Sequence, residues 1–269
     1  MLTSRRLSVL VVDDSAVVRQ TLAAILAQEP DMRVAVAADP LIAQAKIARE
    51  RPDVIVLDLE MPRMDGLTFL GALMARDPIP VVICSGLTAG GAEQAMRALE
   101  EGAVSIVTKP RMAVREFLYE SAVIMVDAVR AAAQAKLPAR RMRSAPPSGA
   151  PVPKLSADAM LPRRNGGCPP AHADTVIAMG ASTGGTEALR EVLQAFPEGA
   201  PGAVVVQHMP EAFTTAFAAR LDASCAVQVA EARDGDLVRP GRVLIAPGNR
   251  HLMLRRSGGQ YSVAVAEGP

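Results

Sequence analysis

The chain of 269 residues contains no tryptophan, and only 3% of its residues are aromatic. Its cores must therefore be built from aliphatic side chains and methionine. Half of the residues are hydrophobic and 21% are charged, which is enough apolar material for a sizeable core. A chain of this length suggests about two domains.

Cysteine is also scarce. Three cysteines lie far apart in the sequence, at Cys84, Cys168 and Cys225, and none belongs to a C-x-x-C pair. This pattern argues against both a thiolate zinc site and a disulfide framework. It fits a protein of a reducing compartment, and we expect a cytoplasmic location.

Long hydrophobic runs and an excess of one charge are missing as well. The first apolar run, residues 7–12, is cut off by Asp13 and Asp14. It is too short for a signal peptide or a membrane span, so we expect the protein not to be membrane-inserted. The net charge of +1 argues against nucleic acid as the main ligand.

The first half of the sequence alternates regularly between apolar runs and helical patterns. Each of five apolar runs is followed by a segment with helical periodicity, the last of them covering residues 113–135. This pattern predicts a (βα)5 doubly wound α/β domain over residues 1–135, with a parallel sheet. The predicted strands are residues 7–12, 32–37, 54–57, 80–84 and 104–108.

Polar residues stand at the carboxyl ends of these predicted strands, where doubly wound folds bind their ligands. They are Asp13, Asp14, Asp58, Ser85 and Lys109. Three neighbouring carboxylates repel one another, and a hard cation such as Mg²⁺ relieves the repulsion. Lys109 can pair with an added phosphoryl group, and Ser85 can form a hydrogen bond to it.

This half resembles the receiver domain of two-component response regulators. The resemblance implies that Asp58 accepts phosphate from a histidine kinase and that Ser85 and Lys109 form the phosphate switch. One departure is Ile106, which stands where many receivers carry an aromatic residue. The resemblance covers about residues 7–135 and rests on Val11-Val12-Asp13-Asp14, Leu57-Asp58-Leu59-Glu60-Met61-Pro62-Arg63-Met64-Asp65-Gly66, Ser85 and Thr108-Lys109-Pro110.

The same resemblance implies a magnesium site. Asp13, Asp14, Asp58 and the backbone carbonyl of Glu60 would hold the ion in the receiver domain. Residues 136–173, which follow, are rich in proline and in basic residues, and we interpret them as a flexible linker. A basic linker can touch an acidic surface or anionic lipid, but a solvated segment is the favoured interpretation.

The stretch from Val176 to Thr186 organises the second half. An apolar run leads into a turn of small residues around Ser182, and a helical pattern begins after Gly185. This predicts a strand, a sharp turn and a helix N-terminus, where free N–H groups could hold a developing oxyanion. The G-x-S-x-G pattern formed by Gly180, Ser182 and Gly184 arises easily by chance, so a base is needed to support catalysis.

His208 is the candidate base, because it follows the predicted strand 202–206 as Ser182 follows the strand 175–179. If the two strands are parallel neighbours, both side chains emerge at one edge, and a hydrogen bond between them would activate the hydroxyl. His251 is the second candidate, although it begins a predicted hairpin. Further strands are predicted at 226–229 and 243–246, a helix at 213–221, and a hairpin of residues 252–255 and 261–266.

The second half resembles chemotaxis protein-glutamate methylesterases. The resemblance implies Ser182 as nucleophile, His208 as base and the Thr183 backbone N–H in the oxyanion hole, with no cofactor in the esterase site. The reaction would be hydrolysis of glutamate methyl esters on chemoreceptor signalling helices, releasing methanol, with deamidation of receptor glutamines by the same chemistry. It rests on Met179-Gly180-Ala181-Ser182-Thr183-Gly184-Gly185-Thr186-Glu187-Ala188, Gln207-His208-Met209-Pro210, Asp234-Gly235-Asp236 and Ile245-Ala246-Pro247-Gly248-Asn249-Arg250-His251.

The family carries its catalytic aspartate in a Gly-Met-Gly-x-Asp-Gly segment, which these 269 residues do not contain. Asp222, Asp234 and Asp236 do not match it, so the third residue of the triad is left open. We expect residues 174–269 to hold only the N-terminal part of a methylesterase domain, a truncated α/β domain with a mainly parallel sheet. We also expect low activity from these residues alone.

Two other functions stay open at this stage. One is a response regulator with a DNA-binding output, which would require a helix-turn-helix with a basic recognition helix. No such pattern follows the predicted linker, where strands alternate with helices. The other is a receiver-domain phosphoacceptor protein whose truncated output domain is inactive.

Overall fold

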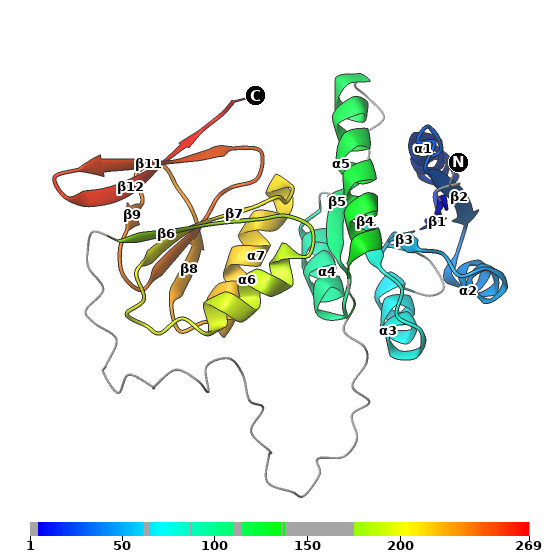
Figure 1. The fold of residues 1–269 in the computed structure, drawn as a ribbon, viewed down its shortest axis with the longest axis horizontal. Coiled ribbons are helices and arrows are strands. Elements are labelled where there is room, and N and C mark those ends of the chain that lie inside the picture. Colours follow the sequence, from blue (N-terminus) through cyan, green and yellow to red (C-terminus); the bar gives the residue numbers. More distant parts are fainter. Residues whose placement is uncertain are drawn as a thin grey trace, which may run out of the picture.

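The computed structural model describes residues 5–61, 65–86, 88–109, 115–135, 137 and 175–268, without the side chains of residues 89 and 115–121. It contains two α/β units that lie side by side (Figure 1). The predicted linker at 136–173 falls almost wholly outside the described residues, so its structure stays a prediction.

The first unit confirms the predicted parallel α/β fold. Its five strands form one parallel sheet in the order β2-β1-β3-β4-β5, and helices connect them. The elements are β1 (Leu7–Val12), α1 (Ala16–Ala27), β2 (Met32–Ala37), α2 (Pro40–Arg49), β3 (Val54–Leu57), α3 (Gly66–Arg76), β4 (Val81–Ser85), α4 (Ala89–Glu100), β5 (Ser105–Thr108) and α5 (Arg115–Gln134).

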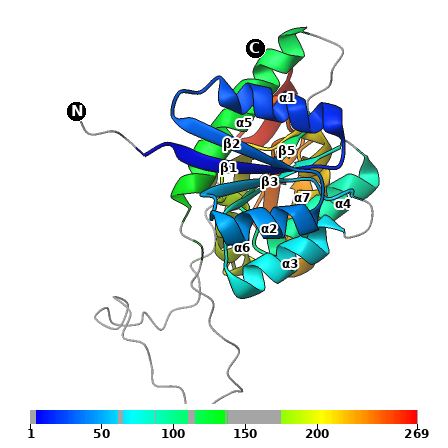
Figure 2. The same cartoon turned by 90° about the vertical axis from the view of Figure 1, so that its right-hand side faces the viewer.

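Alternate residues of the strands face the two sides of this sheet, and each side has its own helices. Val9 and Val11 of β1 belong to a cluster with residues of α1 and α5. Leu10 and Val12 belong to a second cluster with residues of α2, α3 and α4. Figure 2 shows the sheet between these two layers. The aliphatic core predicted from the composition therefore forms on both faces.

The second unit has a four-stranded parallel sheet in the order β6-β7-β10-β8 and a three-stranded antiparallel sheet in the order β11-β12-β9. The two-residue strand β9 was not predicted, and β8 begins two residues later than expected. The elements are β6 (Val176–Ala181), α6 (Gly185–Gln194), β7 (Gly202–Gln207), α7 (Glu211–Ser224), β8 (Gln228–Glu231), β9 (Leu237–Val238), β10 (Arg242–Ile245), β11 (His251–Ser257) and β12 (Gln260–Ala266).

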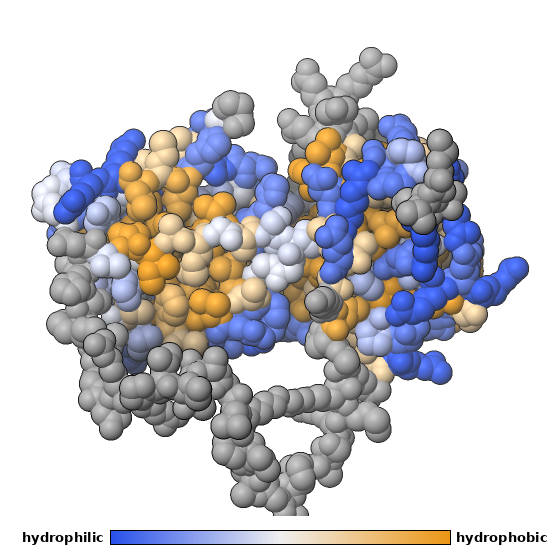
Figure 3. Space-filling view, viewed as in Figure 1, coloured by the Kyte–Doolittle hydropathy of each residue, from blue (hydrophilic) through white to orange (hydrophobic). Residues whose placement is uncertain are grey.

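The parallel sheet of this unit is covered differently on its two faces. Val205 and Ile245 pack with residues of α6 and α7. Val204 and Leu244 pack on the other face with residues of β9 and β12. Some apolar side chains of the second unit stay exposed, including Val206, Met253 and Leu254. Figure 3 shows the apolar surface over this part of the molecule.

The two units meet through α4 and the start of β5 on one side and α6 and α7 on the other (Figure 1). Apolar residues of both units form one continuous cluster across this contact. Arg220 of α7 donates to the Met96 carbonyl at 2.6 Å and pairs with Glu100 at 2.6 Å, both on α4. A partly buried charged side chain with two partners fixes how the units face each other.

The described helices were also compared with the length and hydropathy that a bilayer crossing requires. Among the described residues, no helix is both long enough and apolar enough to cross a membrane.

Candidate functional site

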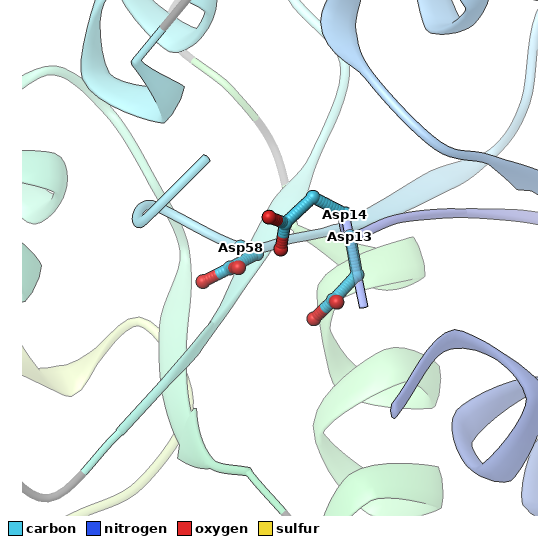
Figure 4. Close-up of side chains that lie close together, drawn as sticks. All are labelled: Asp13, Asp14 and Asp58. Atoms are coloured by element: carbon cyan, nitrogen blue, oxygen red, sulfur yellow. The ribbon is translucent and has the colours of Figure 1, made fainter. Parts of the chain in front are cut away.

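An acidic pocket lies at the carboxyl edge of the first sheet. Val12 and Leu57 are paired residues of the neighbouring strands β1 and β3, so Asp13 and Asp58 leave the sheet side by side. Oxygens of Asp13, Asp14 and Asp58 lie within 4.8 Å of one another. Figure 4 shows the three carboxylates close together. Asp13 and Asp58 are each 1% exposed, whereas Asp14 is exposed. The predicted grouping of the three residues is therefore present.

Lys109 supplies the positive charge of this pocket. Its ammonium group lies 2.7 Å from Asp58 Oδ2 and 3.3 Å from Asp13 Oδ2. The backbone also contributes, because the Ser15 N–H donates to Asp13 Oδ1 and the Glu60 N–H donates to Asp58 Oδ1. One cation thus faces two buried carboxylates, and the pocket keeps an excess of negative charge.

Burial controls the protonation of these carboxyl groups. Loss of hydration raises the pKa of Asp13 and of Asp58, and the nearby Lys109 charge only partly offsets this effect. Burial also opposes the charge of Lys109, but its two carboxylate partners outweigh that and raise its pKa. Lys109 therefore stays protonated, while the two aspartates hold their charge less readily than exposed ones.

The donor set fits a small hard cation. Asp13 Oδ2 is buried and accepts no hydrogen bond within the described ranges, although Lys109 lies close enough to pair with it. All candidate donors are oxygens, which Mg²⁺ prefers. The Glu60 N–H contact with Asp58 places the Glu60 backbone beside the pocket, as a role for its carbonyl requires. The pocket is thus chemically suited to the predicted ion.

Ser85 lies at the same edge, as the last residue of β4. It is fully buried, and its hydroxyl makes only long contacts of 3.5 Å with the carbonyls of Gly86 and Gly91. Its own carbonyl accepts from the Lys109 N–H at 2.9 Å. Ser85 and Lys109 are therefore held together by the sheet, and among the described residues the hydroxyl has no close partner that would prevent it from turning toward a ligand.

The serine turn lies at the carboxyl edge of the second sheet. β6 continues through Gly180 and Ala181, two residues beyond the prediction, because these residues pair with Val206 and Gln207 of β7. Ser182 follows directly and is exposed. Gly184 has a φ of 75°, a left-handed conformation that favours glycine, and α6 begins at the next residue. The predicted strand, turn and helix are present.

His208 leaves the sheet beside Ser182. Ala181 and Gln207 are paired residues, and the His208 N–H donates to the Ala181 carbonyl at 2.9 Å. The two candidate residues thus occupy corresponding positions after neighbouring parallel strands. Both are exposed, and within the described ranges no hydrogen bond joins the hydroxyl to the imidazole. His251, the second candidate base, begins β11 in the antiparallel sheet.

Carboxylates of the second unit have partners other than His208. We call the sheet edge that carries Ser182 and His208 the serine rim. Asp222 accepts from the Val229 N–H, and Asp234 accepts from the Val265 N–H. Asp236 pairs with Arg242, and Glu231 accepts from the hydroxyls of two α7 threonines. In the part of the chain described, no carboxylate forms an ion pair with His208. The structure thus offers no third triad residue among these groups, in line with the open assignment made from the sequence.

The backbone N–H groups of the turn have different partners. The Gly185 N–H donates to the Ser182 carbonyl at 2.8 Å. The Gly184 N–H donates to the Val104 carbonyl of the first unit at 3.1 Å. Among the described residues, no acceptor forms a hydrogen bond with the Thr183 N–H. It is therefore available, as its predicted place in an oxyanion hole requires.

Two residues that contact the Ser182 turn were not assigned any role from the sequence. Gln207 contacts backbone groups of both Ser182 and His208, and Val104 bonds the serine turn through its carbonyl. A polar residue at the end of a buried strand was a usable signal for Gln207. Val104 acts through its backbone, and the identity of a residue says nothing about such a contact.

Comparison with known proteins agrees with this division of the chain. Residues 9–134 match the family description "Response regulator receiver domain", and residues 177–268 match "CheB methylesterase". The protein is thus a response regulator in which a receiver domain precedes a methylesterase output domain.

Curated relatives cover almost the whole chain. A protein-glutamate methylesterase/protein-glutamine glutaminase of Anaeromyxobacter dehalogenans is 60% identical over 268 residues, which are 99% of this chain and 73% of that protein. A relative of the same name in Geobacter metallireducens is 53% identical over 267 residues, covering 98% of this chain and 74% of that protein. The chain belongs to the protein-glutamate methylesterase/protein-glutamine glutaminase family.

Two solved structures from Thermotoga maritima are also similar. The CheB methylesterase catalytic domain is 40% identical and covers 35% of this chain and 50% of its own, with a TM-score of 0.34. The response regulator domain of CheB is 38% identical and covers 49% of this chain and 99% of its own, with a TM-score of 0.44.

Proposed function

We propose that the protein hydrolyses glutamate methyl esters on chemoreceptors, releases methanol and deamidates receptor glutamines, under the control of phosphorylation. It would act in chemotaxis adaptation in the cytoplasm. The observation that carries this proposal is the register of β6 and β7, in which Ser182 and His208 follow paired residues at one edge of the sheet. Family membership supplies the substrate class.

In the proposed reaction the Ser182 oxygen attacks the carbonyl carbon of the ester, and His208 takes the hydroxyl proton. The tetrahedral intermediate carries a negative oxygen, which the Thr183 N–H would stabilise. Collapse of the intermediate breaks the bond to the methoxy group, and the proton from His208 leaves with methanol. Water then cleaves the serine ester by the same steps in reverse, with a glutamate as product.

The contact between the domains supports the proposal that the receiver domain controls the reaction. An oxygen of Asp58 would attack phosphorus while the bond between phosphorus and the histidine of a chemotaxis kinase breaks. Asp13, Asp14, Asp58 and the Glu60 carbonyl would hold Mg²⁺, which would offset the negative charge of the phosphoryl group. Ser85 and Lys109 would then contact the new phosphoryl oxygens and change the receiver surface.

Among the described residues of the receiver, α4 and Val104, the residue before β5, contact the output domain. The Val104 carbonyl accepts from the N–H of Gly184, two residues after Ser182, and Arg220 of α7 bonds α4. A receiver held against this turn would restrict access of a receptor helix to Ser182. We propose that phosphorylation of Asp58 weakens this contact.

The test measures methanol release from methylated receptor by the 269-residue chain. A parallel reaction uses the 60% identical relative from Anaeromyxobacter dehalogenans. Ser182→Ala should abolish release, whereas Ser224→Ala, at an exposed serine of α7, should not. Asp58→Asn should abolish activation by a phosphodonor without removing basal release. An unchanged rate in Ser182→Ala would exclude the serine mechanism.

A second function is favoured by one specific observation. Among the described residues, no hydrogen bond joins the Ser182 hydroxyl to the His208 imidazole, and no carboxylate forms an ion pair with His208. A phosphoacceptor protein with an inactive output domain would have these features. It predicts phosphorylation of Asp58 with no methanol release from the chain under any condition, while the relative stays active.

A further inference from the structure

Gln207 is the last residue of β7 and comes directly before the proposed base. Its side chain is 6% exposed, at the junction between the two turns that carry Ser182 and His208. The amide nitrogen donates to the Ser182 carbonyl at 3.0 Å and to the His208 carbonyl at 3.3 Å. One side chain thus bonds the backbone of both proposed catalytic residues.

These contacts fix the orientation of the amide. Carbonyl oxygens accept hydrogen bonds and cannot donate them, so the NH₂ group of the amide must face the two carbonyls. The amide oxygen then points away, is buried, and accepts no hydrogen bond within the described ranges. A buried acceptor without a donor is destabilising, because the lost hydration is not replaced. An apolar side chain of this length would fill the same volume without that cost, so packing alone does not explain a glutamine here.

The first turn of α6 holds the amide in place. A Cβ atom at Gly185 would lie 2.5 Å from the Gln207 amide oxygen and 2.5 Å from the Ala181 Cβ atom. Only glycine leaves room for the glutamine. The Gly185 N–H also donates to the Ser182 carbonyl, which therefore accepts two hydrogen bonds and has no freedom to rotate away.

We propose that Gln207 is a positioning residue, which holds the Ser182 and His208 turns at the separation that proton transfer between hydroxyl and imidazole requires. This inference rests on the proposed function of Ser182 and His208. Gln207 touches only their backbone and does not contact the reacting atoms. A displacement of about 1 Å at such a site reduces a rate by about a hundredfold.

The probe is a fluorophosphonate, which reacts with an activated serine: the serine oxygen bonds to phosphorus, the phosphorus–fluorine bond breaks, and fluoride and a proton leave. Gln207→Met removes the donor, and Gln207→Glu keeps the shape but presents a carboxylate to the two carbonyls. Gln228→Met is the control, because Gln228 is exposed on β8 of the same sheet. The measured quantities are the labelling rate per labelled site and the final labelled fraction of the 269-residue chain.

We expect both Gln207 variants to label completely but about ten- to hundredfold more slowly, with Gln228→Met at the wild-type rate. A merely structural role predicts the opposite, a reduced labelled fraction that reacts at the wild-type rate, and would overturn the inference. Complete labelling of Gln207→Met at the wild-type rate would overturn it as well.

Failure of the proposed function gives a distinct result. In that case the wild-type chain is not labelled at Ser182, or the Ser182→Ala variant is labelled equally. The positioning role of Gln207 would then be excluded together with the proposed function. The contact itself has a second readout that needs no activity. Removal of the donor should shift the carbonyl carbon resonances of both Ser182 and His208 in Gln207→Met. Unchanged resonances would contradict the role even if labelling were slow.

Discussion

The two sheet edges of this protein organise their polar residues in contrasting ways. In the receiver domain Asp13 and Asp58 are buried, lie within 4.8 Å of each other and share one cation. In the output domain Ser182 and His208 are exposed, and only their backbones are connected. The acidic pocket is thus shaped by charge, whereas the serine rim is shaped by backbone geometry.

The position of Ser182 in its sheet accounts for part of this difference, whereas His208 is exposed although it follows the interior strand β7. Asp13 and Asp58 follow β1 and β3, which both have neighbours on either side in the order β2-β1-β3-β4-β5. Ser182 follows β6, which is an edge strand of the described second sheet. The last residue of an interior strand is flanked on both sides by the loops of neighbouring strands. The last residue of an edge strand is flanked on one side only. Substitutions should therefore affect the two sites through different physical terms.

The largest expected effect is on the charge balance of the acidic pocket. Lys109→Met leaves two buried carboxylates without their cation and should lower the free energy of unfolding by about 2 kcal/mol at pH 7. The pKa values of Asp13 and Asp58 are already raised above 3.8 and should rise further. The folded state then binds more protons than the unfolded state above pH 3.8, so stability falls as pH rises.

The loss in Lys109→Met should therefore be smaller at pH 5 than at pH 7. Urea unfolding followed by circular dichroism at both pH values measures it. Lys46→Met, at an exposed position on α2, is the control. An equal loss at both pH values would show that Lys109 acts by packing and not by charge, which would remove the contrast between the two sites.

The next effect concerns cation binding at the same pocket. Mg²⁺ needs ionised carboxylates, and burial raises the pKa of Asp13 and Asp58. Affinity for Mg²⁺ should rise with pH, by up to about tenfold per pH unit for each proton displaced. Calorimetric titration at pH 5 and pH 7 tests this. Asp58→Asn, with one titrating group fewer, should weaken the pH dependence, and an affinity independent of pH would refute the coupling.

A smaller effect on stability is expected at the serine rim, where backbone conformation and not charge is altered. Gly184→Ala puts a side chain on a residue with a φ of 75° and should lower the free energy of unfolding by about 1 kcal/mol. Gly199→Ala is the matched control, since Gly199 has open space around it and no positive φ. Thermal unfolding compares the two. If both variants lose equally little, the turn is not constrained by its backbone.

The smallest effect is expected at the contact between the domains. Arg220→Ala removes the bonds to Met96 and Glu100 of α4 and should raise basal methanol release about threefold, because an ion pair near the surface contributes at most about 1 kcal/mol. Arg97→Ala is the control, because Arg97 lies on α4 but pairs with Glu93 of the same helix. Lower basal activity in Arg220→Ala would contradict restraint by the receiver.

The sequence was sufficient to predict most of the fold and the placement of side chains at strand ends. Asp58, Lys109, Ser182 and His208 could be found because each follows a recognisable apolar run, and parallel strands bring their carboxyl ends together. The extra length of β6 was missed because a glycine and an alanine look like the start of a turn. Pairing with β7 extended the strand, a tertiary effect that local propensity does not contain.

Other parts of the site could not be predicted for a related reason. The Val104 contact uses a carbonyl, which every residue possesses, and it depends on how two domains are packed. The role of Gln207 depends on Gly185, 22 positions earlier, which leaves space for its amide. β9 has only two residues, too few for any alternation to be detected. Such features arise from docking of distant segments and leave no local pattern.

The bond between the Gly184 N–H and the Val104 carbonyl has a consequence for how the enzyme would be switched on. While the domains are docked, this hydrogen is occupied by the receiver. Once they separate, this N–H can donate to water or to a substrate oxygen, two residues from Ser182. Undocking would then alter the electric field at the serine as well as expose it, so a detached output domain and a blocked one would differ in chemistry, not only in access.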